Sequence, residues 1–154
     1  MVRTHQSVLL GKIAVLLGAA MMTMASVDEP STSPHLVTAI VSPFRKTHGF
    51  LGCRLFHSAD GFPESGRDVD EVRVPVVEAT TRWEFRTVAP GTYALAVMHD
   101  ENDNRKLDKG FLGIPTEGYG VSNNKTYAMS TPKWSESTFK VGAQDVVLSI
   151  VLRY

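Results

Sequence analysis

Beyond residue 35, this sequence consists mainly of short segments in which apolar and polar side chains alternate. In Thr80–Thr87, the residues Trp83 and Phe85 share one side of the segment, whereas Arg82 and Glu84 share the other. Successive side chains of a β-strand point to opposite faces of a sheet, so a period of two predicts strands with one buried face. Segments of this kind, with turn residues between them, predict an all-β protein.

About seven strands are predicted in this way. They are Leu36–Ser42, Phe50–His57, Val72–Val77, Thr80–Thr87, Tyr93–Asp100, Ser137–Val141 and Val146–Leu152. Short strands at regular spacing are typical of a single antiparallel β-sandwich of the immunoglobulin type. Pro75 cannot donate to a neighbouring strand, so the third strand is expected at an edge. The last strand is almost entirely apolar, and we expect it in a central position, in a hairpin with the strand before it.

The N-terminal part has a different pattern. Arg3 and Lys12 flank a polar start, and Ile13–Ala25 contains no charged residue. This arrangement is typical of a secretory signal peptide, and the apolar run is shorter than the roughly 20 residues that a membrane-spanning helix needs. We therefore expect residues 1–25 to be a cleaved signal peptide, with a membrane anchor as the alternative. Residues 26–35 are then a flexible lead and residues 36–154 the folded domain of an exported protein, periplasmic or secreted, without a membrane span.

The distribution of charge limits the kinds of partner that the chain can bind. The chain has 16 basic and 16 acidic residues, and removal of residues 1–25 takes away two of the basic ones without leaving any lysine or arginine run. Nucleic-acid grooves need such a basic cluster, so nucleic acid is not an expected partner.

Cys53 is the single cysteine, which excludes an internal disulfide. It lies on the apolar side of its predicted strand, where a buried and inert thiol is expected.

The longest connection, His99–Asn124, lies between the fifth and sixth predicted strands and contains many acidic, amide and glycine residues. Oxygen-bearing side chains stand at the spacing of a calcium-binding loop, and calcium is the one cofactor that the sequence suggests. These residues are Asp100, Asn102, Asn104 and Asp108. Arg105 and Phe111, however, stand where such loops carry a glycine and a bidentate carboxylate. The alternative is a series of Asx turns, in which the same side chains accept hydrogen bonds from nearby backbone amides.

Two histidines suggest a different chemistry. His57 and His99 end the second and fifth predicted strands on the same parity, and they would lie at one end of the molecule if these strands ran the same way in facing sheets. With Asp100 and Glu117 they would form a metal-dependent or acid–base hydrolytic site. The alternative is a pair of structural histidines bonded to loop carbonyls. The sequence contains no motif of serine hydrolases, zinc proteases or phosphate-binding loops, so hydrolysis is the second hypothesis.

The second half of the long connection offers groups that suit a polar ligand. Tyr119 supplies an aromatic face, and Asn123 and Asn124 supply amides. With His99 and Glu117 they would bind a carbohydrate, another polar ligand or an envelope protein, although the same residues also suit a loop that packs on itself. The leading hypothesis is a non-enzymatic binding or accessory module whose functional surface is the loop of residues 99–124.

Bacterial secreted proteins of the domain-of-unknown-function family 2141 resemble this chain. The resemblance is carried by HDENDNRKLD and GIPTEGYGVSNN, by PGTYALAVMHD before them and by a last strand ending in LRY. It covers about Leu36 to Tyr154 and implies a small exported β-sandwich. The lead-in Pro90–Tyr93 is more distantly similar to the transthyretin-like modules that accompany carboxypeptidases. Members of the family often have glycine after Asn104, where this chain has Arg105.

Overall fold

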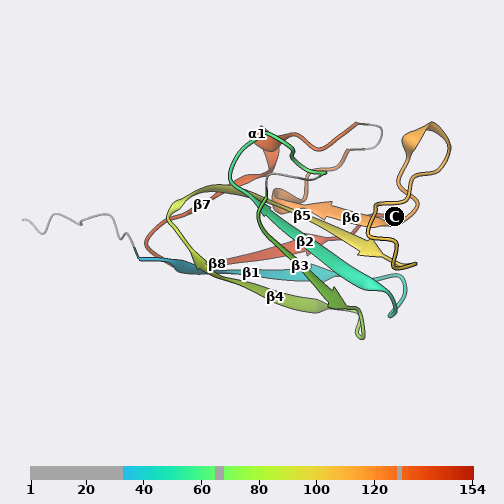
Figure 1. Cartoon of the computed structure of the whole chain (residues 1–154), viewed down its shortest axis with the longest axis horizontal. Helices are drawn as coiled ribbons and strands as arrows, with labels where there is room; N and C mark the ends of the chain where they lie inside the picture. Colours follow the sequence, from blue (N-terminus) through green and yellow to red (C-terminus); the bar gives the residue numbers. More distant parts are fainter. Residues whose placement is uncertain (1–32, 65–67, 128–129) are drawn as a thin grey trace, which may run out of the picture.

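The computed structural model describes residues 33–64, 68–127 and 130–154. The predicted signal peptide, residues 1–25, and most of the predicted lead, residues 26–35, lie outside this part of the chain. Within it, eight β-strands form a sheet of three strands and a sheet of five, which pack face to face (Figure 1). The predicted all-β sandwich is confirmed.

The three-stranded sheet has the order β4-β1-β8. Its strands are β1 (His35–Ser42), β4 (Thr81–Val88) and β8 (Val146–Val151). β1 runs antiparallel to β4 and parallel to β8. The β1–β8 pair is the one parallel pair among the described strands, and it joins the two ends of the domain.

The five-stranded sheet has the order β3-β2-β5-β6, with β7 also paired to β5. Its strands are β2 (Phe50–Phe56), β3 (Asp68–Pro75), β5 (Gly91–Asp100), β6 (Gly118–Val121) and β7 (Thr138–Val141). β7 pairs with the first half of β5 and β6 with the second half, so these two short strands follow each other along one side of β5. β3 is at an edge, as its proline predicts.

The core follows from the alternation of the strands. Alternate residues of β1, β2 and β5 face the opposite sheet and are at most 7% exposed: Val37, Ala39, Val41, Leu51, Cys53, Leu55, Tyr93, Leu95 and Val97. Cys53 is fully buried, as its parity predicts, and burial raises the pKa of its thiol to about 12. A thiol with such a pKa stays protonated and is a poor nucleophile.

The predicted position of the last strand is wrong. β7 pairs with β5 and β8 pairs with β1, so the expected hairpin does not form and the two strands belong to different sheets. β8 lies at an edge rather than in the centre, and its Val147 and Val151 are 62% and 41% exposed. Its apolar sequence predicts burial on both faces, but only the face that carries Ile150 meets the core.

β4 has the predicted parity with one difference. Phe85 is 1% exposed, and Arg82 and Arg86 on the other face are exposed. Trp83, which the pattern predicts to be buried, is only partly buried and packs against the margin of the core. The physical reason is that β4 is an edge strand, so the opposite sheet covers its inner face incompletely.

β6 is absent from the predicted strands because its glycines are typical of a loop. A β-carbon at Gly118 would lie 2.6 Å from the ring of Tyr154, and one at Gly120 would lie 2.8 Å from a side chain of β8. Glycine at these two positions therefore allows the close approach of the chain end. The backbone of Tyr119 exchanges two hydrogen bonds of 2.9 Å with Arg153, which fastens β6 to the C-terminus.

Helical structure is minor. The short helices are η1 (Phe111–Gly113), η2 (Ser122–Asn124) and α1 (Trp134–Ser137). Across the described ranges, the structure contains no helix of the length and hydropathy that a membrane crossing requires.

Candidate functional site

Asp100, the last residue of β5, is fully buried. Its carboxylate accepts hydrogen bonds from Arg73 on β3 (2.9 Å) and from the backbone amides of Asn104 (3.1 Å) and Arg105 (3.0 Å). Burial alone would raise the pKa of Asp100, but these donors outweigh it and hold the pKa below its ordinary value of 3.8. The carboxylate thus fixes the first turn of the long loop against the five-stranded sheet.

Glu117, at 4% exposure, holds the same loop from its other end. Its Oε1 accepts a hydrogen bond from the backbone amide of Glu101 (2.7 Å), and its Oε2 accepts one from the backbone amide of Asp108 (3.0 Å). The backbone amide of Thr116 also donates to the carbonyl of Asp108 (2.8 Å). One buried carboxylate therefore ties the start and the middle of the loop to the entrance of β6.

The remaining residues of the predicted calcium set form Asx turns. Asn102 Oδ1 accepts from the amide of Asn104 (3.2 Å), and Asn104 Oδ1 accepts from the amide of Lys106 (2.8 Å). The side-chain amides of Asn102 and Asn104 donate to the two carboxylate oxygens of Asp108, at 2.7 and 2.8 Å. No group of three or more His, Cys, Asp or Glu side chains in the described part of the chain is placed to hold a metal ion. The loop oxygens are thus turned toward N–H donors, which does not fit a calcium shell.

Calcium binding stays a prediction, and the geometry favours the Asx-turn alternative. We expect about 10 mM calcium to leave the Tm unchanged, although this is a hundredfold excess over the roughly 10⁻⁴ M constant of weak extracellular sites. A true site would add about 2.7 kcal/mol of stability at that excess, which thermal unfolding would detect. A rise in Tm that magnesium does not reproduce, and that Asp108→Asn removes, would establish a calcium site instead.

The pH dependence of stability tests the role of the buried carboxylate. Asp100 has a folded pKa below its ordinary 3.8, and Glu101, beside Arg45 and Lys46, has one below its ordinary 4.5 despite burial. The unfolded chain therefore binds more protons, and stability falls as the pH drops below about 4.5 and through the lower folded values. We expect Asp100→Asn to remove part of this slope in urea unfolding, by at most about 1.4 kcal/mol per pH unit.

The matched control for this loss of stability at acidic pH is Glu78→Gln, which changes an exposed carboxylate. It should leave the slope as it is in the unmodified protein. Equal slopes for Asp100→Asn and the unmodified protein would show that the hydrogen bonds of Asp100 do not stabilise its ionised form.

His99 is fully buried and uses both ring nitrogens. Its Nε2 lies 2.7 Å from the carbonyl oxygen of His48, which can only accept, so Nε2 carries the proton. The hydroxyl of Tyr154 accepts a hydrogen bond from the amide of Arg45 (3.1 Å) and is bonded to Nδ1 of His99 (2.9 Å), and a carboxylate oxygen of Glu101 lies 3.9 Å from the same nitrogen. Both ring nitrogens thus have partners within the fold, which describes a structural histidine that connects β5 to the C-terminus.

His57 is not part of this cluster. β2 and β5 are antiparallel neighbours, with Leu51 opposite His99 and Phe56 opposite the start of β5. His57 follows Phe56 at an exposed position, so it lies about 20 Å along the strand from His99. The expectation that both histidines share one end is wrong, because the two strands lie side by side in one sheet. The predicted hydrolytic site is therefore not assembled.

The two asparagines of η2 also have structural partners. Asn124 donates from Nδ2 to the carbonyl of Ser149 (2.7 Å) and accepts at Oδ1 from the amide of Val151 (2.8 Å). Its side chain therefore occupies part of the free edge of β8. Asn123 donates to two carbonyls at the junction of α1 and β7, at 3.2 and 2.9 Å. Asn124 therefore joins the end of β6 to the three-stranded sheet, whereas Asn123 holds α1 and β7 of its own sheet.

A cleft lies on the outer face of the five-stranded sheet. In an antiparallel pair, residues directly opposite each other point to the same face. The outward positions that align across β2, β5 and β6 are Gly52, Arg54, Ala96, Met98, Tyr119 and Val121. Gly52 and Ala96 carry little or no side chain, so the middle of this surface is hollow. It forms the floor of the cleft.

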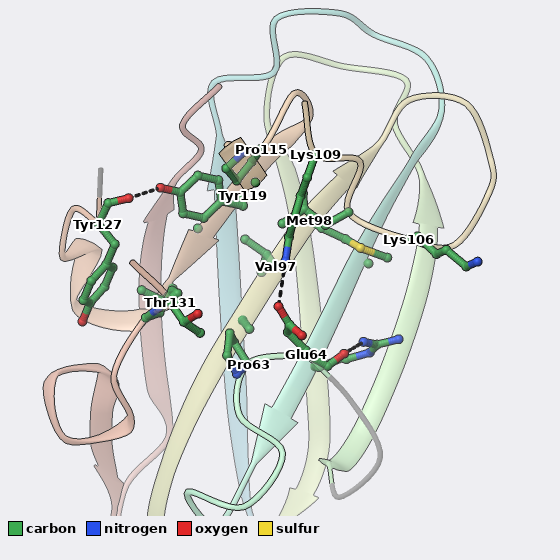
Figure 2. A pocket seen from close by; sticks show the side chains of 18 of the residues that line it. Pro63, Glu64, Val97, Met98, Lys106, Lys109, Pro115, Tyr119, Tyr127 and Thr131 are labelled. Carbon is green, nitrogen blue, oxygen red and sulfur yellow. Dashed lines mark hydrogen bonds and ion pairs between the residues drawn. The ribbon is translucent and has the colours of Figure 1, made fainter. Parts of the chain in front are cut away.

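Described residues of three connections form the walls of the cleft: 105–115, 63–64, and 127 with 130–132. Figure 2 shows Lys109 reaching from the long loop to Glu64, with which it forms an ion pair of 2.8 Å. It also shows the hydroxyl of Tyr119 donating to the carbonyl of Tyr127 (2.8 Å). The enclosed volume is about 480 Å³, within the range of small-molecule sites.

Basic side chains outnumber acidic ones around the cleft. The lining contains Arg54, Arg105, Lys106 and Lys109 but only one acidic residue, Glu64. Arg54 donates to the Glu64 carbonyl and pairs with Glu71 (2.9 Å). Arg105 and Lys106 form no ion pair with other described residues. The remaining lining is largely apolar, so the cleft joins a cationic rim to an apolar interior.

Of the predicted ligand-binding residues, Tyr119 lines the cleft. His99, Glu117, Asn123 and Asn124 lie elsewhere and support the loop or the sheets. Four further lining residues are absent from the predicted set: Arg54, Met98, Lys109 and Tyr127. The available signal was the parity of Arg54, which is opposite to that of the buried residues of β2 and places its side chain on the outer face.

The comparisons with known proteins give one match. A family described as "Uncharacterized protein conserved in bacteria (DUF2141)" matches residues 40–149. No curated protein and no solved structure matches the chain. The matched region extends from β1 into β8 and includes the whole long loop. The chain therefore belongs to the bacterial family DUF2141, as the resemblance of its loop sequence indicates.

Proposed function

We propose that the protein is a non-enzymatic binding module whose cleft takes a small amphipathic anion, with an acid group joined to an apolar body. The observation that carries the proposal is the excess of cations around an apolar hollow. Basic and acidic residues are equal in number over the whole chain, so this excess is a local feature of the cleft.

The cleft offers separate contacts for the two parts of such a ligand. The floor at Ala96 and Met98 and the ring of Tyr119 suit an apolar or aromatic body. Lys109 and Arg54 stand where an acid group would lie at the rim. A hydrogen bond to a charged group contributes more binding free energy in a partly enclosed site than in bulk water. These cations therefore favour an anion over a neutral analogue.

The ion pair between Lys109 and Glu64 does not prevent this binding. The two side chains are 42% and 67% exposed, and an exposed ion pair contributes little stability. The acid group of a ligand can therefore replace the Glu64 carboxylate at Lys109 with little loss.

Export belongs to this proposal as an expectation. It rests on residues 1–25, which lie outside the described part of the chain. A carbohydrate or an envelope protein as the partner remains the competing hypothesis, and the experiment below includes a carbohydrate.

The test uses the fluorescence of 8-anilinonaphthalene-1-sulfonate, an aromatic anion that becomes bright in apolar sites. We expect saturable binding, displaced by octanoate but not by octanol or maltose at the same concentration. Ala96→Leu, which fills the floor, should abolish binding. Lys109→Gln should weaken it about tenfold, the effect of one charge-assisted hydrogen bond.

The matched control is Arg86→Gln, which also removes a paired cation but lies on β4 in the other sheet. It should leave the affinity unchanged. Equal displacement by octanoate and octanol would remove anion recognition from the proposal, and displacement by maltose alone would favour the carbohydrate. Binding that survives Ala96→Leu would place the probe outside the cleft.

A further inference from the structure

The tip of the long loop exposes an unusual group of apolar side chains. Phe111, Leu112 and Ile114 are 90%, 70% and 45% exposed. Figure 1 shows the loop between β5 and β6 projecting beyond the sheets. Three large apolar side chains in four consecutive positions of a projecting loop mark a contact surface, because isolated exposed apolar residues are common but clustered ones are not.

The tip is held in a defined shape. Lys109 and Pro115 form an isolated β-bridge, and the amide of Gly110 donates to the carbonyl of Ile114 (2.8 Å). Leu112 has a φ of 64°, a left-handed conformation that leucine rarely adopts. The backbone thus holds Leu112 in the turn at 70% exposure, although Leu112 and Ile114 also line the cleft.

Basic residues outnumber acidic ones in the segment that precedes the tip. Arg105, Lys106 and Lys109 flank it, and the last of these is only weakly engaged by its exposed ion pair. The acidic residue within the same stretch, Asp108, accepts two hydrogen bonds from the side-chain amides of Asn102 and Asn104. An apolar apex with three cations in the same loop is complementary to an anionic lipid surface, where apolar groups enter the acyl boundary and cations meet headgroups.

We propose that residues 111–114 dock the protein on an anionic lipid surface. The small, projecting shape favours lipid over protein, because a stable protein interface buries about 800 Å² on each partner and three side chains cannot supply that area. The other exposed large apolar residues lie outside this loop: Val77 follows β3, and Val147, Val151 and Tyr154 belong to β8 or follow it.

The first test reports on the apex itself. In Phe111→Trp, the added indole should shift its emission to the blue when vesicles containing phosphatidylglycerol are added, and brominated acyl chains should quench it. Trp83 and Trp134 give the background, which the unmodified protein measures. Val147→Trp is the matched control, because it places an indole at an exposed apolar site of the other sheet, and it should show neither change.

The second test measures vesicle binding by sedimentation in the full chain. Phe111→Ser with Leu112→Ser should weaken binding at least about tenfold, since two apolar side chains no longer enter the lipid. All variants share residues 1–25, so any contribution from that segment cancels in the comparison. Pure phosphatidylcholine vesicles and high salt should each weaken binding, because both remove the electrostatic part.

Three results would overturn the proposal: an indole at position 111 that remains unquenched, vesicle binding that survives the double serine variant, or concentration-dependent self-association that this variant abolishes. The last would assign the tip to a second copy of the chain. The tip shares Leu112 and Ile114 with the wall of the cleft. Ala96→Leu separates the two proposals, because it should abolish binding of the fluorescent anion and leave vesicle binding intact.

Discussion

Glu117→Ala should destabilise the protein by about 3–5 kcal/mol and abolish binding of the fluorescent anion in the cleft. The wild-type carboxylate is 4% exposed and accepts hydrogen bonds from the amides of Glu101 and Asp108. A hydrogen bond to a charged group contributes about 1.5–3 kcal/mol, and its loss here leaves two amide donors without an acceptor. The loop that forms one wall of the cleft then separates from β6. Urea unfolding and the fluorescence titration measure the two effects.

Glu84→Ala is the matched control for this prediction. It removes a carboxylate that pairs with Arg82 and Arg86 on β4, far from the long loop in the fold. An exposed ion pair contributes at most about 1 kcal/mol, so the control should lose little stability and keep its affinity for the anion. A Glu117→Ala protein that loses stability but binds the anion normally would show that the cleft does not depend on this connection.

Phe85→Ala should cost about 3–5 kcal/mol, the usual range for removing a buried aromatic side chain. Phe85 is 1% exposed in the core between the sheets. Trp83→Ala should cost less, about 1–3 kcal/mol, because its larger ring is only partly buried on the same strand, which is an edge strand of the sheet. Arg82→Ala should stay below about 1 kcal/mol. Urea unfolding of the three variants should rank them in this order, and a Trp83 effect equal to that of Phe85 would contradict the partial burial.

Most of the strands could be predicted because alternation is a local property. Cys53 and Phe85 each occupy the face that their parity predicts. Pairing between distant strands has no local signal, which is why the partners of β7 and β8 differ from the predicted hairpin. β6 was missed for a related reason: Gly118 is favoured by the ring of Tyr154 packed against it, a contact between residues far apart in the sequence.

The long loop could be located but its chemistry could not. The spacing of Asp100 and Asp108 suits either a cation or a series of Asx turns, and only the direction of the amide donors around their carboxylates distinguishes the two. The cleft is still less visible in the sequence. Its floor depends on Gly52 and Ala96 standing opposite larger outward residues, which requires the register of three strands. Nothing in the sequence around either small residue indicates that it forms part of a binding site.

The parallel pairing of β1 and β8 has a consequence for how the chain folds during synthesis. β1 begins at His35 and β8 ends at Val151. The three-stranded sheet is therefore complete only when the first of the described strands pairs with the last. The hydroxyl of Tyr154, the final residue, then closes the network with His99. Contacts between such distant residues slow folding. Until β8 is in place, one edge of β1 is open to mispairing, as is the edge of β5 that β6 and β7 later cover.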